Sequence, residues 1–383
     1  MRNDACRNVL AGHDRAIFRA AILLRNVVSA CHYFNIITFA DELAFFCTSW
    51  LNAPNFPRGA TKLKGLGFVQ NYIEPVKRLI LWLERTPYGK LFADEADSKI
   101  HAHGFGMGLN IMSFNVRRGT RRDGRNHWVH RRSLVKEVLE RYRPDVLGLQ
   151  EALDFQIGEI RAMLPGYDVT GLGNWGGSRG LHTAIFYDAQ RFMLADSGTF
   201  WFSPTPYVPG SRGWGNIIPR TCTWARLVEL KTRRAFYFYN VHLDHLSRHS
   251  RRKSVVLLAR HIQARPLLDP FILGGDFNAG EENPSIRYLK GQVQLKFRDS
   301  GILLNPIPLR DTFRDRYPNH ARVGTYHGFG RFFFRFKLDY IFVPPSVHIR
   351  EARIIEFCRE NCYPSDHFPL YSRIVLPPFA AAS

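Results

Sequence analysis

The chain has 383 residues, 45% of them hydrophobic and 14% aromatic, which is the composition of a globular protein with a substantial core. Its formal net charge of +20 favours polyanionic substrates or partners, unless it only reflects a compositional bias toward arginine. The six cysteines show no CxxC spacing, so neither a structural zinc site nor a secreted disulfide framework is indicated. A reducing intracellular compartment, by default the cytoplasm, is therefore expected.

Residues 1–108 differ from the rest of the chain and are expected to form an N-terminal extension that is helical or partly disordered. Its apolar stretch, residues 26–46, is interrupted by His32 and by Asp41 and Glu42, so no transmembrane segment is predicted. The arginine-rich start could be an organelle-targeting peptide, although acidic residues interrupt it. Helical spacing predicts a helix over Tyr72–Arg85, and a Gly- and His-rich linker ends the extension.

From residue 109 the pattern changes to many short strands with few helices, and we expect a catalytic domain over residues 109–377, followed by a tail, 378–383. Helical spacing predicts helices over residues 130–142, where Pro144 ends the pattern, and 250–264. Strands are expected at 109–116, 145–151, 183–187, 192–201, 223–230, 235–243, 271–280, 337–343, 347–357 and 368–376. This order favours two stacked sheets with helices outside them over a Rossmann sheet.

The stretch 271–280 combines an apolar run with two polar side chains, Asp276 and Asn278. On an extended backbone these two point to the same face, and Phe277 points to the other. A carboxylate and an amide on one face can hold a water molecule and a phosphate oxygen together. The alternative is a strand that simply ends in a turn, since Gly, Asp and Asn are common turn residues.

Other expected strands also end in acidic, amide or imidazole side chains. Each buried polar group without a partner would cost about 1–3 kcal/mol, so convergence into one cleft is the favoured interpretation. Taken singly, Asn115 could cap a turn, Asp339 could pair with Lys337, and His242 could be a satisfied core residue. The set comprises Asn115, Glu151, Asn240, His242, Asp244, Asp276, Asn278, Asp339, Asp366 and His367.

Three of these residues, Asn115, Glu151 and Asp366, offer oxygen ligands and no thiolate. Such hard donors suit Mg²⁺ or Mn²⁺ and not structural zinc. Mg²⁺ usually keeps water ligands that a substrate phosphate can replace, so this set predicts phosphoryl chemistry.

Seven motifs, in this order, resemble the endonuclease/exonuclease/phosphatase superfamily, which includes deoxyribonuclease I. They are MSFNVR (112–117), DVLGLQE (145–151), AIFY (184–187), NVHLDH (240–245), GGDFN (274–278), LDYIF (338–342) and SDH (365–367). The resemblance implies a deoxyribonuclease I-like α/β fold, a four-layer α/β/β/α sandwich with the site at one end of its two sheets.

The resemblance also implies roles for individual residues. Asn115 and Glu151 would lie on the metal side, with Asp366 contributing. Asp276 would activate the attacking water, and Asn278 would hold it and a phosphate oxygen.

His367 would contact the scissile phosphate, oriented by Asp339, and His242 would be a general acid. Tyr187 would face the phosphate, with packing as the alternative. Many relatives carry a glutamate where this chain has Leu181, which leaves the acid role of His242 open, and Asp244 could substitute.

The substrate is less closely defined by the sequence. Among the named members of the superfamily, the chain most resembles deadenylase-like 3′–5′ RNA exonucleases. Most of its positive charge follows residue 108, which suits a nucleic acid substrate. We expect Arg220 to contact phosphate and Trp214 to stack on a base, unless its loop, residues 203–219, packs on itself. The expected substrate-binding residues are Asn240, Asp244, Arg220, Arg118 and Trp214.

The leading hypothesis is a monomeric, Mg²⁺-dependent phosphodiester hydrolase acting on nucleic acid, with RNA favoured. One alternative is a phosphatase or phospholipase-type phosphodiesterase that acts on inositol phosphates, sphingomyelin or another small or lipid substrate. A non-enzymatic alternative is an inactive polyanion-binding module.

Overall fold

The computed structural model describes residues 106–321, 323–331 and 335–377. The expected helix at Tyr72–Arg85, most of the N-terminal extension and the tail after residue 377 lie outside the described residues. Within the described part, no helix is both long and apolar enough to cross a membrane.

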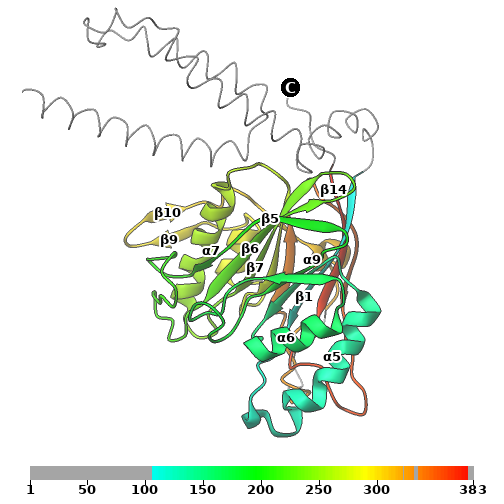
Figure 1. Cartoon of the computed structure of the whole chain (residues 1–383). Helices are drawn as coiled ribbons and strands as arrows, with labels where there is room; N and C mark the ends of the chain where they lie inside the picture. The colour runs from blue at the N-terminus through cyan, green and yellow to red at the C-terminus, as the bar shows by residue number, and fades with distance from the viewer. Residues whose placement is uncertain (1–105, 322, 332–334, 378–383) are drawn as a thin grey trace, which may run out of the picture. The chain divides into compact units, whose positions relative to one another are not determined.

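The described residues form two six-stranded sheets and a two-stranded ribbon (Figure 1). The first sheet has the order β13-β14-β1-β2-β4-β3 and the second has the order β11-β12-β8-β7-β6-β5. β1 and β2 pair in parallel, as do β7 and β8, and the other neighbours are antiparallel. The first sheet comprises β1 (Met107–Asn115), β2 (Val146–Gln150), β3 (Tyr167–Thr170), β4 (Ile185–Asp188), β13 (His348–Ile354) and β14 (Leu370–Leu376). The second comprises β5 (Phe192–Trp201), β6 (Thr221–Glu229), β7 (Ala235–His242), β8 (Phe271–Asp276), β11 (Arg310–Asp311) and β12 (Asp339–Val343), and the ribbon is β9 (Leu295–Phe297) with β10 (Gly301–Leu303).

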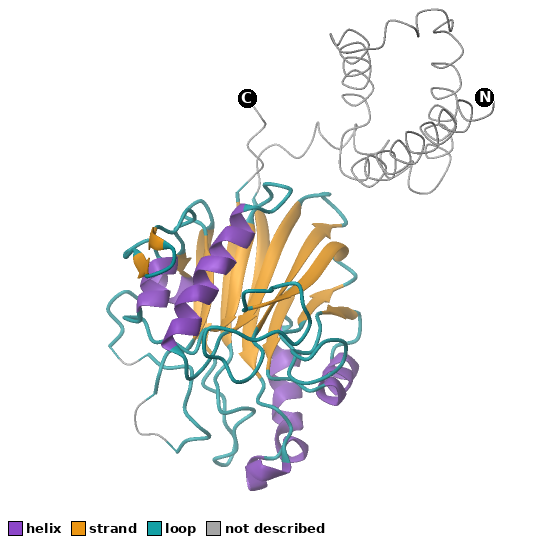
Figure 2. Ribbon diagram, turned by 90° about the vertical axis from the view of Figure 1, so that its left-hand side faces the viewer, coloured by secondary structure: helices purple, strands orange, loops and turns teal. Residues whose placement is uncertain are grey.

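Helices cover the outer face of each sheet, so the domain has four layers (Figure 2). α5 (Trp128–Tyr142) and α6 (Asp154–Met163) pack on the first sheet, whereas α7 (Arg248–Gln263) and α8 (Pro284–Leu289) pack on the second. α9 (Thr312–Arg316) follows β11. A third apolar cluster, which includes Ile111, Phe238 and Ile272, fills the space between the sheets. The expected four-layer α/β/β/α sandwich is confirmed.

The two long helices form where the sequence predicts them. The spacing of Leu134, Val138 and Leu139 gives α5 one buried stripe, and the helix ends at Arg143, which has a left-handed backbone before Pro144. α7 begins two residues earlier than expected, because the Ser247 side chain caps its first turn by accepting a hydrogen bond from the Ser250 N–H.

Stretch 271–280 departs from its predicted extended form. β8 ends at Asp276, and Asn278 has φ 48°, so the argument that alternation places both side chains on one face is wrong. Gly275 is required where β8 passes β7, because a Cβ at this position would lie 2.1 Å from the Val241 carbonyl oxygen.

Asn240 ties the two sheets together deep inside the sandwich. Its side chain has no exposed surface and donates hydrogen bonds to the carbonyls of Leu149, at 2.9 Å, and Ala184, at 2.8 Å. Its oxygen accepts a hydrogen bond of 2.7 Å from the Gln150 side chain. The amide therefore joins β7 of one sheet to β2 and the start of β4 in the other.

Replacing this amide with an apolar side chain should destabilise the domain. We expect Asn240→Leu to lower the free energy of unfolding by about 1–3 kcal/mol, because it removes the buried partner of the Leu149 carbonyl. Urea unfolding should show a lower midpoint with an unchanged slope. The exposed Asn319→Leu is the control and should shift stability by less than about 0.5 kcal/mol. Equal effects of the two variants would contradict this role for Asn240.

Candidate active site

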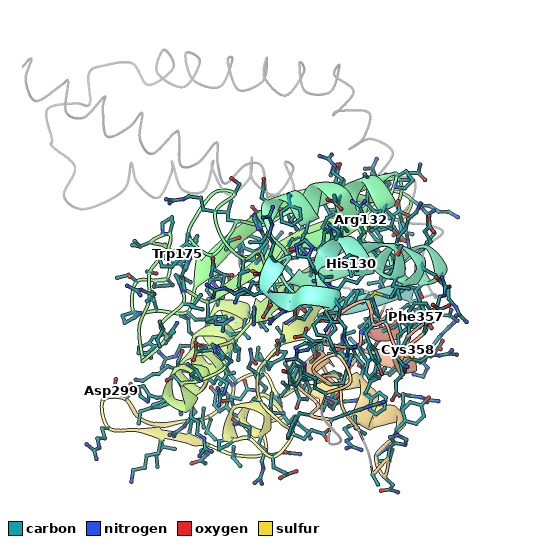
Figure 3. All side chains as sticks on the ribbon, turned by 90° about the horizontal axis from the view of Figure 1, so that it is seen from below. His130, Arg132, Trp175, Asp299, Phe357 and Cys358 are labelled. Atoms are coloured by element: carbon teal, nitrogen blue, oxygen red, sulfur yellow. The ribbon has the colours of Figure 1, made fainter. Side chains whose placement is uncertain are left out.

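The predicted polar residues meet at one end of the sandwich, where strand ends of both sheets lie next to one another. Asn115 ends β1, and Glu151 follows β2 in the first sheet. His242 ends β7 and Asp276 ends β8 in the second sheet, where Asp339 begins β12 opposite Asp276. Asp366 and His367 lie just before β14. Figure 3 looks onto the domain from below the view of Figure 1, with Trp175 to one side and Phe357 and Cys358 to the other.

The Asp276 carboxylate lies at the centre of this group and is 1% exposed. Its Oδ2 accepts a hydrogen bond of 3.0 Å from the Asn115 side chain, and its Oδ1 accepts one of 2.8 Å from the Asn278 N–H. The Nε2 atoms of His242 and His367 lie 3.7 Å and 3.9 Å from Oδ2. Burial and the nearby Asp339 carboxylate raise the pKa of Asp276 to about 7, although His367 acts in the opposite direction.

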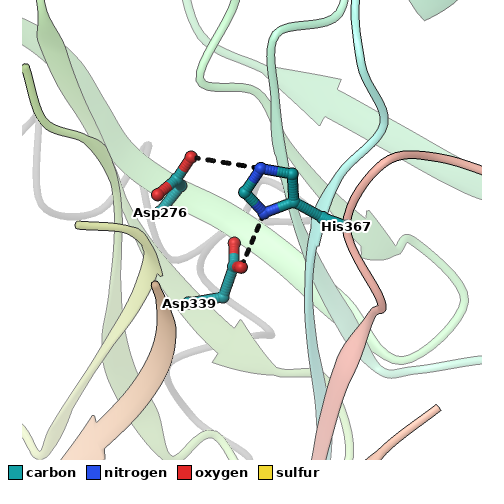
Figure 4. Close-up of side chains that lie close together, drawn as sticks. All are labelled: Asp276, Asp339 and His367. Atoms are coloured by element: carbon teal, nitrogen blue, oxygen red, sulfur yellow. Dashed lines mark hydrogen bonds and ion pairs between the residues drawn. The ribbon is translucent and has the colours of Figure 1, made fainter. Parts of the chain in front are cut away.

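His367 is paired with Asp339, as expected, through a contact of 2.7 Å between Nδ1 and Oδ2 (Figure 4). Burial alone would lower the pKa of His367, but the carboxylates of Asp339, Asp276 and Asp366 raise it to about 10. The Thr325 hydroxyl accepts a hydrogen bond of 3.1 Å from the Asp339 N–H and so fixes the start of β12. These three carboxylates therefore favour the cationic form of the imidazole beside Asp276.

Glu151 and Asp366 flank a guanidinium that the sequence analysis did not single out. Nη1 of Arg117 lies 3.8 Å from Glu151 and 3.7 Å from Asp366. Nε and Nη2 of the same guanidinium donate hydrogen bonds to Asp123. Burial raises the pKa of Asp366, and the Glu151 carboxylate raises it further, whereas His367 and Arg117 lower it. Two carboxylates that repel each other in a buried position gain stability from a cation between them.

This arrangement fits a divalent cation of the Mg²⁺ type. Glu151 and Asp366 offer carboxylate oxygens, and the Asn115 Oδ1 accepts one hydrogen bond, from the Arg117 N–H, which leaves a second lone pair. Asp276, Asp339 and His367 form a second group that could hold a metal, with ligand atoms within 4.8 Å of one another. Within this second group, however, Asp339 and His367 are already hydrogen-bonded to each other.

Three non-glycine residues at these strand ends have left-handed backbones: Arg117 (φ 54°), Glu151 (φ 65°) and Asn278 (φ 48°). This conformation is uncommon for residues with a Cβ and is kept only where the surrounding structure enforces it. The turn of the backbone after each strand directs the next side chains across the end of the sheet.

His242 has a partner that its sequence neighbourhood did not indicate. The Arg220 guanidinium lies 2.8 Å from the His242 Nε2, 2.7 Å from the His245 Nδ1 and 3.5 Å from Asp244. Burial, Arg220 and His367 together lower the pKa of His242 well below its usual value. These contacts favour a neutral imidazole, which is the opposite of what a general acid requires.

The remaining residues expected at the site differ in their surroundings. Tyr187 pairs with Val146, at the end of β2 away from Glu151, and packs between the sheets, so the phosphate-facing role is wrong and the packing alternative holds. The inaccessible Asn240 cannot touch a substrate, and its predicted binding role is also wrong. Asp244 is 2% exposed and accepts hydrogen bonds from the N–H groups of Leu246 and Ser247, and Trp214 packs against the core under α7. Arg118 is exposed, and its N–H lies 3.5 Å from Glu151.

Arg131 is the residue whose importance the sequence analysis missed most clearly. Its buried guanidinium donates to the carbonyls of Val116, Arg117 and Asn126 and, at 2.8 Å, to that of Pro364. It thereby holds the segment after β1 against the segment that carries Asp366 and His367. The signal in the sequence is an arginine in line with Leu134, Val135 and Val138 on the apolar face of α5.

Comparisons with known proteins give the family. The model of the Endonuclease/Exonuclease/phosphatase family matches residues 112–367. An endonuclease/exonuclease/phosphatase from Bacteroides vulgatus is 29% identical, with TM-score 0.63, over 71% of this chain and 100% of that chain. The mannosyl-6-phosphatase Bt3783 of Bacteroides thetaiotaomicron is 30% identical, with TM-score 0.60, over 70% of this chain and 100% of that chain. An uncharacterised protein of Acanthamoeba polyphaga mimivirus, L388, is 32% identical over 45% of this chain and 68% of its own length.

Replacing the Arg131 guanidinium with the ammonium group of lysine should disturb the site as well as the fold. Lysine cannot reach four carbonyls, so we expect Arg131→Lys to lower the free energy of unfolding by about 1.5–3 kcal/mol. Activity at a temperature where the variant stays folded should fall too, with a weaker apparent affinity for the divalent cation. The neighbouring, exposed Arg132→Lys should match the parent in both measurements. Identical behaviour of the two variants would show that Arg131 does not position the site.

Proposed function

Because this chain belongs to the endonuclease/exonuclease/phosphatase family, whose members hydrolyse phosphoester bonds, we propose that it is a phosphoester hydrolase that requires Mg²⁺ or Mn²⁺. The observation that carries this proposal is the placement of Asp276. Both carboxylate oxygens are fixed by hydrogen bonds, and two imidazoles lie within 4 Å. The pKa of Asp276, about 7, suits a group that must take a proton from water at neutral pH.

In the proposed reaction, Asp276 accepts a proton from a water molecule that attacks the phosphorus atom. The new bond joins the water oxygen to phosphorus, and the bond between phosphorus and the leaving oxygen breaks. The leaving oxygen keeps the bonding electron pair and takes up a proton from solvent. His367, kept cationic by Asp339, donates a hydrogen bond to a phosphate oxygen and offsets the growing negative charge. Asn278 keeps the Asp276 carboxylate in place through its backbone N–H.

Arg220 and His242 act in this proposal as a pair. Arg220 is 5% exposed and is held between Asp244, His242 and His245, so its position is fixed without a substrate. Its charge attracts the phosphate, and the neutral His242 orients the guanidinium. This replaces the general-acid role that was left open for His242.

Glu151, Asp366 and the Asn115 amide oxygen would hold the divalent cation. Bound there, it supplies positive charge that stabilises the phosphate oxygens as charge builds up on them. The Arg117 guanidinium beside the two carboxylates balances part of their charge in its absence.

A nucleic acid, with RNA favoured, is the substrate that the net charge of +20 suits best, and a 3′–5′ exonuclease of the deadenylase type is the specific form that we propose. A phosphatase acting on a small phosphorylated molecule is the second candidate. It is favoured by the 30% identity to a mannosyl-6-phosphatase over 70% of this chain.

A screen of purified protein separates these candidates. It would contain poly(A), structured RNA, single-stranded DNA, a sugar 6-phosphate, a phosphoinositide and sphingomyelin, each with Mg²⁺, with Mn²⁺ and with a chelator. Hydrolysis of RNA alone supports the nuclease, and hydrolysis of the sugar phosphate alone supports the phosphatase. Failure to cleave any of them with either metal would refute the proposed function.

The two central carboxylates should respond differently to added metal. Asp276→Asn keeps the shape but removes the proton acceptor, so we expect turnover to fall about 10²–10⁴-fold at every metal concentration. Glu151→Gln should instead weaken metal binding, and excess Mg²⁺ or Mn²⁺ should partly restore turnover.

The measurement is the initial rate against metal concentration for both variants and the parent. The control is Glu140→Gln, which removes an exposed carboxylate of α5 and should leave the curve unchanged. Rescue of Asp276→Asn by metal, without rescue of Glu151→Gln, would mean that the two roles are reversed.

A further inference from the structure

A cavity of about 150 Å³ lies directly beside the candidate metal ligands. One wall is the 3₁₀ segment η1 (Arg121–Asn126) and the other is the turn Tyr326–Arg331, with Asp366 at the end nearest the site. Its lining residues are Arg117, Arg122, Asp123, Asn126, Tyr326, Gly328, Phe329, Arg331 and Asp366. None of the roles proposed above uses this space.

Three arginines and two aspartates, Asp123 and Asp366, line the cavity, so its net charge is positive. Arg122 and Arg331 are both exposed, and no carboxylate of residues 106–321, 323–331 or 335–377 forms an ion pair with either. Asp123 is engaged with Arg117, from Nη2 at 3.0 Å and Nε at 3.2 Å, so its charge is largely balanced. Two guanidinium forks therefore remain for an anion that enters from solvent.

The walls are fixed to the catalytic residues. The N–H groups of His327 and Gly328 donate to the Asp366 carbonyl at 3.0 Å and 3.2 Å, which ties the turn to the candidate metal ligand. Gly328, Phe329 and Gly330 all have positive φ, so the turn is tight. On the other wall, Arg131 donates to the Asn126 carbonyl at 3.0 Å and lies over the Phe329 ring at 5.9 Å. The cavity is thus part of the same rigid framework as the site.

Size and lining limit what can bind. A volume of about 150 Å³ corresponds to a group of roughly the size of a benzene ring, so the cavity can hold one phosphate with part of its sugar. The aromatic rings of Tyr326 and Phe329 supply an apolar surface beside the two arginines.

We propose that this cavity is a second phosphate subsite, which binds a phosphate group carried by the substrate next to the scissile phosphoester. Arg122 and Arg331 bind that phosphate, and the aromatic wall contacts the sugar or base attached to it. The inference rests on the proposed function, since it assumes that the scissile phosphate lies by Asp276 and Asp366. It assigns the substrate class as a compound with two neighbouring phosphates, such as an oligonucleotide or a sugar bisphosphate.

The test compares paired substrates that share the scissile bond and differ only in the neighbouring phosphate. One arm uses the RNA dinucleotide ApA with and without a terminal phosphate, and the other uses mannose 1,6-bisphosphate and mannose 6-phosphate. The variants are Arg122→Ala and Arg331→Ala. The matched control is Arg125→Ala, an exposed arginine of η1 that does not line the cavity.

For the parent, kcat/KM should be higher for the substrate with the second phosphate. The quantity compared is the ratio of kcat/KM with the second phosphate to kcat/KM without it. Each variant should lower this ratio about 10–100-fold, mainly through KM, because a hydrogen bond to a charged group is lost. Arg125→Ala should leave the ratio unchanged. The arm in which the ratio falls identifies the source of the phosphate. An unchanged ratio in both arms for both variants, or an equal fall with Arg125→Ala, overturns the subsite.

A binding measurement keeps this test separate from the proposed function. Titration calorimetry with adenosine 3′,5′-bisphosphate and adenosine 5′-monophosphate needs no turnover. The parent should bind the bisphosphate more tightly, and Arg122→Ala and Arg331→Ala should remove that advantage. If no substrate is cleaved but this advantage appears and depends on both arginines, the hydrolase proposal fails and the subsite stands. Equal binding of the two nucleotides by the parent overturns the subsite.

Discussion

The hydrogen bond from the Asn115 side chain to Asp276 joins the ends of two strands that belong to different sheets and are 161 residues apart. It forms only if the two sheets pack face to face in the observed register. The buried Asn240 amide, which lies farther inside the sandwich, fixes that register by bonding to both sheets. Arg131 extends this framework to the segment before β14, so that Asp366 and His367 complete the group. The site is therefore a property of the whole sandwich and not of any one motif.

Bringing so many ionisable groups out of water has an electrostatic cost that the site balances internally. Carboxylates and cations alternate across it: Asp339 with His367, Glu151 and Asp366 with Arg117, and Asp244 with Arg220. Asp276 is 1% exposed and lies next to the Asp339 carboxylate, and its pKa is raised to about 7 although His367 lies 3.9 Å away. The residue that the proposed chemistry needs as a base thus has a pKa near neutrality.

Much of this could be predicted from the sequence, because the relevant signals are local. Alternation along β7 places Asn240 and His242 on the inner face of the second sheet, and the strand-end positions of Asn115, Glu151 and Asp276 follow from short apolar runs. The prediction failed where a residue near a motif lies too deep or at the wrong end of its strand, as for Asn240 and Tyr187. Alternation also failed at Asn278, because the backbone leaves the extended region there.

The contacts of Arg131, Arg220 and Arg117 could not be predicted, since they join segments far apart in the chain and depend on side-chain packing. Short elements such as α8, β9 and β10 were missed because three to six residues carry too little periodicity to distinguish a helix or strand from a loop. A cavity between two loops, such as the one lined by Arg122 and Arg331, has no sequence pattern at all.

The central claim is that water, activated beside Asp276, attacks phosphorus. Hydrolysis of the cleaved substrate in H₂¹⁸O, followed by mass spectrometry of both products, tests it most directly. The account predicts one ¹⁸O atom in the phosphate-bearing product and none in the released alcohol or sugar. Label in the alcohol would mean that a carbon–oxygen bond breaks, and a product without label would mean that a substrate hydroxyl attacks in place of water. Either result would contradict the role assigned to Asp276.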